Sequence, residues 1–158
     1  MSSKTNYAWD TCIFIAWLCE EAGAPLVDIG LVVDEIDTDK SNLIVSVTTF
    51  SEILETKYSP DQIDKLNQFL QRSNVIKVET SFKIAKKASG IRSAASREGR
   101  KVETPDAQIV ATAIVYGADV LHTLDDKLLA LNGSPIVDGL KIETPKPLSG
   151  QAALPFGD

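Results

Sequence analysis

The fold is decided by the stretch Asn6-Tyr7-Ala8-Trp9-Asp10-Thr11-Cys12-Ile13-Phe14-Ile15. Its first four residues favour a short strand, and the segment from Asp10 to about Glu21 has the pattern of a helix. A short strand that opens directly onto a helix is the first half of a repeating strand–helix unit. This stretch therefore predicts a chain in which strands and helices alternate.

The alternation continues along the rest of the chain. Further strands are expected at residues 43–47, 75–78, 119–122 and 141–143. Helices are expected at residues 10–21, 24–36, 48–57, 81–98, 104–116 and 124–131, with one more starting at Ser59-Pro60-Asp61. Alternation with short connections predicts a three-layer α/β/α domain with a largely parallel sheet.

Length and composition fit one compact domain. The chain has 158 residues, of which 44% are hydrophobic, enough for a full core. We expect this domain to span residues 1–145, followed by a Pro- and Gly-containing tail, 146–158, that is extended or disordered. The longest apolar run, 13–18, is far shorter than a membrane span, and no signal peptide is visible, so a cytoplasmic protein without membrane contact is expected. Cys12 and Cys19 would lie about 10 Å apart on one helix, too far to bridge, and are expected to be buried thiols in a reducing compartment.

Positive charge is concentrated in one segment of an acidic chain. The net charge is −6, yet residues 77–101 hold eight Lys or Arg against two Glu. On an ideal helix, four of these cations share one face: Lys83, Lys86, Lys87 and Arg97. Two interpretations stay open, a solvated helix face or a stripe that binds phosphate groups.

Several kinds of catalytic site are excluded by the residues present. His122 is the only histidine and lies in an apolar strand, where a structural role is expected. A Ser-His-Asp or Cys-His site therefore lacks its base, and a His/Cys zinc site lacks ligands. The glycine-rich loops that bind nucleotide phosphates are absent from the sequence.

Acidic residues stand at equivalent places in successive strand–helix units. They are Asp10, Glu52, Asp106, Asp125 and Asp126. Each has an ordinary explanation, because carboxylates favour helix N-termini. The spacings Thr49-x-x-Glu52 and Thr123-x-x-Asp126 also resemble capping arrangements.

Taken together, these carboxylates indicate a metal site. In a parallel sheet the helices that follow the strands begin at one edge, so the acidic side chains would come together there. Like charges at short range repel unless a cation lies among them. Oxygen ligands without His or Cys favour Mg²⁺ or Mn²⁺, ions that activate water for phosphoryl chemistry. With the basic segment nearby, this combination predicts metal-dependent cleavage of phosphodiester bonds.

Four segments resemble the motifs of PIN domains, in order and with similar spacing. They are Tyr7–Ile15 with its Asp10-Thr11 pair, Val45–Leu54 with Ser46 at a strand end and Glu52 six residues later, Asp106–Ala113, and Ala118–Asp125 with its Thr-x-Asp ending. The resemblance spans roughly residues 5–145. It implies a single-strand-specific, Mg²⁺- or Mn²⁺-dependent ribonuclease, in bacteria often the VapC-type toxin of a toxin–antitoxin pair.

The resemblance also implies roles for individual residues. Asp10, Glu52 and Asp106 would be core metal ligands, and Asp125 would hold a second metal or orient the attacking water. Asp126 lies one step past the matched position and is expected to cap a helix. The hydroxyl groups expected to bind the ligand carboxylates or a metal-bound water are those of Thr11, Ser46 and Thr123.

The expected partners are RNA, an antitoxin protein and a second copy of the chain. The cations expected to hold the RNA backbone are Lys83, Lys86, Lys87, Arg97, Arg100 and Lys101. Because residues 20–39 are acidic, the substrate is expected to approach from the side of residues 77–101.

Two other functions share part of this sequence pattern. A catalytically inactive PIN-like module could bind RNA or protein, although it has no need for mutually repelling carboxylates. A phosphohydrolase of the haloacid dehalogenase type also begins with Asp after a strand, but it needs a second Asp two residues later, where this chain has Cys12. The RNA target and the number of metal ions, one or two, are left open by the sequence.

Overall fold

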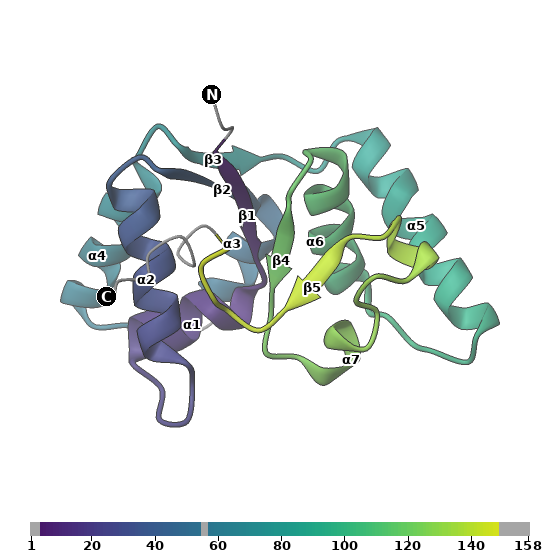
Figure 1. Cartoon of the computed structure of the whole chain (residues 1–158), viewed down its shortest axis with the longest axis horizontal. Coiled ribbons are helices and arrows are strands. Elements are labelled where there is room, and N and C mark those ends of the chain that lie inside the picture. Colours follow the sequence, from purple (N-terminus) through teal and green to yellow (C-terminus); the bar gives the residue numbers. More distant parts are fainter. Residues whose placement is uncertain (1–3, 55–56, 149–158) are drawn as a thin grey trace, which may run out of the picture.

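The central sheet contains five parallel strands (Figure 1). The computed structural model describes residues 4–54 and 57–148. In this part the strands are β1 (Thr5–Trp9), β2 (Ser41–Ser46), β3 (Val75–Val78), β4 (Val120–His122) and β5 (Lys141–Glu143). Their order across the sheet is β3-β2-β1-β4-β5, and every neighbouring pair is parallel. The expected parallel α/β architecture is confirmed.

Helices connect successive strands. They are α1 (Thr11–Cys19), α2 (Leu26–Asp37), α3 (Val47–Ile53), α4 (Pro60–Leu70), α5 (Phe82–Arg97), α6 (Thr104–Val115) and α7 (Asp126–Leu129), with a short 3-10 helix, η1 (Pro135–Val137). The sequence did not predict η1, and it predicted a longer α7. It also placed Glu52 near the start of a helix over residues 48–57, whereas Glu52 lies in the last turn of α3, because this helix begins at Val47 and ends at Ile53.

Side chains alternate between the two faces of the sheet, as the period of a strand requires. In β1, Tyr7 and Trp9 join the hydrophobic cluster formed with α1, α2 and α4, whereas Ala8 joins the cluster formed with α5 and α6. Figure 1 shows these two groups of helices on opposite sides of the strands. Both faces are therefore buried, and the edges formed by the strand ends are left to carry polar groups.

An aromatic cluster fixes α1 against the sheet. The ring of Trp9 lies 4.9 Å from Phe14, 6.3 Å from Trp17 and 5.9 Å from Phe69 of α4. Each such pair contributes about 0.5–1.5 kcal/mol beyond the burial of its area. This packing sets the position of the first turn of α1, which begins directly after Asp10.

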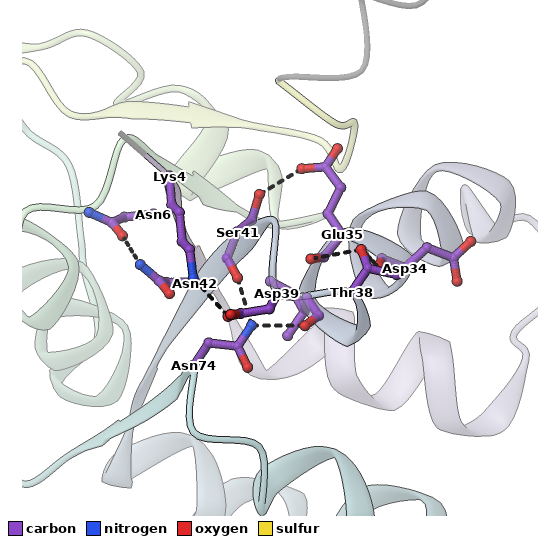
Figure 2. Close-up of polar contacts among 10 residues, drawn as sticks. Lys4, Asn6, Asp34, Glu35, Thr38, Asp39, Ser41, Asn42 and Asn74 are labelled. Atoms are coloured by element: carbon purple, nitrogen blue, oxygen red, sulfur yellow. Dashed lines mark hydrogen bonds and ion pairs between the residues drawn. The ribbon is translucent and has the colours of Figure 1, made fainter. Parts of the chain in front are cut away.

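Polar contacts fix the amino ends of the strands, at the edge opposite the strands' carboxyl ends (Figure 2). The Asn74 side-chain amide donates to the carbonyl oxygens of Ile36 and Ser41 at 2.8 and 2.7 Å. The Ser41 hydroxyl donates to Glu35 at 2.7 Å. These bonds satisfy polar groups at the turn from α2 into β2, where their burial without partners would be costly.

The last described residues pack against the domain. The backbone N–H of Leu148 donates to the Tyr7 hydroxyl at 2.8 Å, and Leu148 contacts the cluster around α1 and α2. Residues 149–158, which carry most of the expected tail, lie outside the described residues. Within the described part, no helix is long and apolar enough to cross a membrane.

Candidate active site

Four acidic side chains line one cavity at the carboxyl ends of the strands. The cavity has a volume of about 460 Å³ and is lined by Asp10, Thr11, Cys12, Ile15, Glu52, Asp106, Leu124 and Asp125. It lies beside the ends of β1 and β4, where the strand order changes direction between β2 and β4. Open parallel sheets form their ligand-binding crevices at such switch points.

Asp10 is the most firmly held of the four carboxylates. Its Oδ1 accepts the N–H of Thr11 at 2.8 Å, and its Oδ2 accepts the Thr123 hydroxyl at 2.8 Å and the Cys12 thiol at 3.5 Å. Only 5% of the residue is exposed. Burial raises the pKa of Asp10, against the hydrogen bonds to Thr123 and Thr11, which lower it. The bonds set its orientation, and burial makes its negative charge costly.

Glu52 is oriented by a second threonine. The Thr11 hydroxyl donates to Glu52 Oε1 at 2.6 Å, which joins the first turn of α1 to the last turn of α3. This bond leaves Glu52 Oε2 without a hydrogen bond to any described residue. Thr11 therefore orients Glu52, while Thr123 holds Asp10.

Asp125 caps α7, which corrects the expectation that Asp126 does so. Asp125 has an extended backbone, and its Oδ1 accepts the N–H of Lys127 at 2.8 Å. Its own N–H donates to the Thr123 hydroxyl at 3.0 Å. Asp126 is the first helical residue, so the cap falls one residue earlier than the spacing from Thr123 suggested. Asp125 Oδ2 accepts no hydrogen bond from a described residue, and Asp125 lines the cavity.

Asp106 is the carboxylate most affected by its neighbours. It is the third residue of α6 and is half-buried. Burial, followed by the charges of Asp10, Asp125 and Glu52, raises the pKa of Asp106 from 3.8 to about 6. No described side chain donates a hydrogen bond to it. The four acidic residues thus interact electrostatically across one cavity.

The acidic side chains have the donor atoms that a hard divalent cation prefers, but in this structure they lie too far apart to coordinate one together. The four carboxylates and Thr11 offer only oxygen donors, the ligands that Mg²⁺ and Mn²⁺ favour. Among residues 4–54 and 57–148, however, no three His, Cys, Asp or Glu side chains are grouped closely enough to hold a metal ion. Binding an ion would therefore require rotation of side chains such as Asp106, which accepts no hydrogen bond from a described side chain.

Cys12 is a cavity residue that the sequence analysis missed. It was expected to be a buried structural thiol, but Cys12 and Cys19 are both only partly buried. Cys12 Sγ accepts the N–H of Leu124 at 3.4 Å and lies 3.7 Å from the Thr123 hydroxyl. Burial and the Asp10 carboxylate raise the pKa of Cys12 to about 12, so the thiol stays protonated. Its position two residues after Asp10, in the first turn of α1, was the available signal.

Three other polar residues lie outside this cavity lining. Ser46 caps α3 by accepting the N–H of Thr48 at 3.2 Å, so the cap expected from Thr49 is wrong. Thr49 is buried, and its hydroxyl has no hydrogen-bond partner within the described part of the chain. His122 is also fully buried, with its ring 5.2 Å from that of Tyr7. The role expected for Ser46 beside the metal ligands stays a prediction.

The residues of the basic segment, 77–101, line two separate cavities. Lys83, Lys86 and Lys87 help line a cavity of about 480 Å³ that extends to Val115, the last residue of α6. A second cavity, of about 400 Å³, is lined by Arg92, Ser96, Gly99, Arg100, Lys101 and Val102. Arg97 is exposed and is not among the lining residues of either. Since Asp106 lies in the first turn of α6, the lysine cavity is at the far end of that helix.

Comparison with known proteins identifies the fold family. Residues 7–133 match the PIN domain. The chain belongs to the PIN domain family. No curated protein sequence matches it at a significant level.

Solved structures with the same fold include chains from three bacterial complexes. A chain of VapBC2 from Rickettsia felis, bound to a DNA fragment from its promoter, has a TM-score of 0.66 and 18% identity, covering 90% of this chain and 100% of that one. A chain of DNA-bound VapBC from Salmonella typhimurium has a TM-score of 0.60 and 20% identity, covering 89% of this chain and 98% of that one. A chain of FitAcB from Neisseria gonorrhoeae has a TM-score of 0.60 and 17% identity, covering 88% of this chain and 97% of that one. At these identities the likeness shows that this PIN domain shares their fold.

Proposed function

We propose that this PIN domain is a metal-dependent endoribonuclease that uses Mg²⁺ or Mn²⁺ to hydrolyse RNA phosphodiester bonds. The observation that carries the proposal is the cavity lined by Asp10, Glu52, Asp106 and Asp125, in which the mutual repulsion of carboxylates contributes to an Asp106 pKa of about 6. A protein maintains such repulsion at a cost to its stability, and a cation bound among the carboxylates would remove that cost.

The proposed roles follow from how each carboxylate is held. Asp10, fixed by Thr11 and Thr123, would be the rigid ligand. Glu52 and Asp106 would turn their free oxygens toward the ion, and Asp125 would complete the site or orient the attacking water through Oδ2. A bound Mg²⁺ or Mn²⁺ would activate water and stabilise the charge that develops on the phosphate. The Cys12 thiol and Thr123 would hold Asp10 in its ionised form.

The substrate would be a single RNA strand held through its backbone. The acidic carboxylate cavity repels phosphate groups, so cations must supply the attraction. We propose that the six cations of the basic segment do so: Lys83, Lys86, Lys87, Arg97, Arg100 and Lys101. Of these, Arg100 and Lys101 lie in the loop that leads into α6 and Asp106, so they would contact RNA near the bond that is cut.

We also propose that this domain works as the toxin of a toxin–antitoxin pair in the cytoplasm. Its fold is that of chains in VapBC and FitAcB complexes, and the VapBC family is one of toxin–antitoxin systems. The proposed partners are an antitoxin protein, which would restrain the nuclease, and a second copy of this chain.

One observation favours a different function, that of an inactive module binding RNA or protein. The described carboxylates line a cavity without forming a finished metal-ligand group. The two functions differ in metal affinity, because a nuclease must bind the divalent ion that it uses. Calorimetric titration with Mn²⁺ separates them: binding in the micromolar to low millimolar range supports the nuclease, and no binding supports the module.

The direct test is cleavage of a mixed pool of structured RNAs by the purified protein, with Mg²⁺, Mn²⁺ or a chelator. Cuts that need the metal would support the proposal. Intact RNA together with absent Mn²⁺ binding would reject it.

A further inference from the structure

We propose that the cavity of Arg92, Ser96, Arg100 and Lys101 is a phosphodiester subsite that positions the RNA strand beside the carboxylates. This arginine cavity is lined by the last turns of α5 and by the loop that leads to α6. The inference rests on the proposed nuclease function and adds to it a defined place for one backbone phosphate.

The cavity owes its shape to the way in which α5 ends. Gly99 has a φ of 74°, a left-handed conformation that favours glycine. This conformation lets Gly99 N–H reach Ser96 O at 3.0 Å and Arg100 N–H reach Ala95 O at 2.9 Å. Such a reversal is a common helix ending. It folds residues 99–102 back beside the last turns of α5, so Arg100 comes to line the same cavity as Arg92.

Both guanidinium groups are held in place by backbone carbonyl groups. Arg92 Nε donates to Val102 O at 3.0 Å, and Arg100 Nη1 donates to Ala130 O at 3.3 Å. A guanidinium has five N–H donors, so each group keeps four for a ligand. Its planar fork matches the oxygens of a phosphate, and holding it in advance lowers the entropy lost on binding.

The same contacts place the cavity next to the carboxylates. Val102 lies two residues before α6, whose third residue is Asp106. Ala130 directly follows α7, whose N-cap is Asp125. The arginine cavity is therefore connected on both sides to elements that begin at the carboxylate cavity. An RNA strand with one phosphate between Arg92 and Arg100 would have its neighbouring nucleotides within reach of Asp106 and Asp125.

The acidic residues near the cavity are weak competitors for its cations. Glu98 Oε1 lies 3.7 Å from Arg100 Nε, and Glu103 Oε1 lies 3.4 Å from Lys101 Nζ. The side chains of these four residues are between 43% and 77% exposed. Ion pairs between exposed side chains are worth about 0–1 kcal/mol, so a phosphate can replace them.

The lysine cavity is a poorer candidate for this role. Its floor is aliphatic, with Ile91, Val115 and Ile136, and Lys87 is already paired with Asp138. It also lies at the far end of α6, which at 12 residues is about 17 Å long. A strand of four nucleotides can therefore occupy the arginine cavity without needing the lysines of this segment. The control is Lys40, an exposed lysine directly before β2 at the opposite edge of the sheet.

NMR titration with tetrauridylate tests the subsite without any cleavage. The probe is added to ¹⁵N-labelled wild-type protein in EDTA, and the amide shifts of Ser96, Gly99, Arg100 and Lys101 are followed. We expect these amides to move together and those of Lys83–Lys87 to stay nearly still. The Kd should rise about fivefold in Arg100→Gln and in Lys101→Gln, fall in Glu98→Gln, and change less than twofold in Lys40→Gln.

The outcomes separate this inference from the proposed function. Shifts confined to the lysine cavity, or equal losses of affinity in Lys40→Gln and Arg100→Gln, would overturn the subsite. With an RNA that the wild type cuts, Arg100→Gln should raise KM about fivefold with kcat nearly unchanged, as a positioning residue requires. Probe binding at the loop, together with absent cleavage and absent Mn²⁺ binding, would keep the subsite and reject the nuclease. Cleavage of RNA by a protein whose loop amides do not shift with the probe would support the nuclease and overturn the subsite.

Discussion

The Thr123 hydroxyl donates a hydrogen bond of 2.8 Å to Asp10 Oδ2 and thereby joins the end of β4 to the end of β1. The Thr123 hydroxyl oxygen also accepts the N–H of Asp125 at 3.0 Å. One buried hydroxyl thus orients one acidic residue and positions the backbone of a second.

Thr123→Val removes these two bonds while nearly preserving the side chain's shape. The Asp125 N–H loses its acceptor, and the buried Asp10 carboxylate loses a donor, so we expect the free energy of unfolding to fall by about 1–3 kcal/mol. RNA cleavage should fall at least about tenfold, because an outer hydrogen bond that holds a metal ligand is lost. Thr123→Ser keeps the hydroxyl and should keep most of the activity. Equal activity of the Val and Ser variants would contradict this role of the hydroxyl.

Asp106→Asn should stabilise the protein when no metal is present. Asn keeps the shape of the side chain and removes a charge that Asp10, Asp125 and Glu52 oppose. Because Asp106 is only half-buried, solvent screens part of this repulsion, and we expect a gain of about 1 kcal/mol at pH 8. Urea unfolding in EDTA measures it. A loss of stability would mean that the carboxylates do not repel one another across the cavity.

The gain from Asp106→Asn should depend on pH in a defined direction. The pKa of Asp106 is about 6 in the folded chain and 3.8 as its ordinary value, so the folded state binds more protons between these values. Its contribution to stability is therefore lost as the pH rises from about 4 to about 6. The difference in free energy of unfolding between Asp106→Asn and wild type should be small at pH 3.5 and should reach its full value above pH 7. A difference that stays constant across this range would have another cause.

Divalent ions should stabilise the wild type more than Asp106→Asn. A ligand that binds only the folded state raises the free energy of unfolding by about 2.7 kcal/mol at one hundred times its Kd. Thermal unfolding with Mn²⁺, Mg²⁺ or EDTA measures the rise in Tm. Asp126→Asn serves as a control, because Asp126 is the first residue of α7 and is not among the cavity residues. Equal rises in Tm for wild type and Asp106→Asn would place the ion elsewhere.

His122 should make the fold sensitive to acid. Burial, and to a smaller extent Lys146, lowers the pKa of His122 from 6.5 to about 4. The unfolded chain therefore takes up a proton at higher pH than the folded chain, and stability is lost as the pH falls from 6.5 toward 4, by about 2–3 kcal/mol.

His122→Leu should remove this part of the pH dependence. The ring nitrogens of His122 have no hydrogen-bond partner among the described residues, so an apolar side chain of similar size should be tolerated. Unfolding of both proteins at pH 7 and pH 4.5 gives the comparison. A loss of stability on acidification that is as large in the variant as in the wild type would show that other groups cause it.

Much of the fold could be predicted because its signals are local. The apolar residues 43–45 and the Pro at the start of two helices act on neighbouring residues alone. The grouping of acidic residues followed from topology, since helices that follow parallel strands begin at one edge. The sequence therefore predicted that Asp10, Glu52, Asp106, Asp125 and Asp126 would come together at this edge. The structure places the first four in the lining of one cavity, and Asp126 is not among its lining residues.

What could not be predicted depends on contacts between distant segments. The choice of Asp125 over Asp126 as the cap depends on where the chain leaves β4 and on the bond to Thr123. The inclusion of Cys12 in the cavity depends on the approach of Leu124, 112 positions away in the sequence. An ideal helix placed Arg97 with the lysines, but the packing of α5 on α6 and η1 builds one cavity at the lysines and another at Arg92.

The measurement that tests the central claim most directly is cleavage of one RNA pool by four proteins side by side. Wild type, Asp10→Asn, Asp106→Asn and Asp126→Asn are each incubated with Mg²⁺, Mn²⁺ or EDTA, and the products are separated by size. We predict metal-dependent cuts by wild type and Asp126→Asn, with losses of at least a hundredfold in Asp10→Asn and Asp106→Asn. Cleavage that persists in both of those variants, or that continues in EDTA, would show that the activity does not come from this carboxylate cavity.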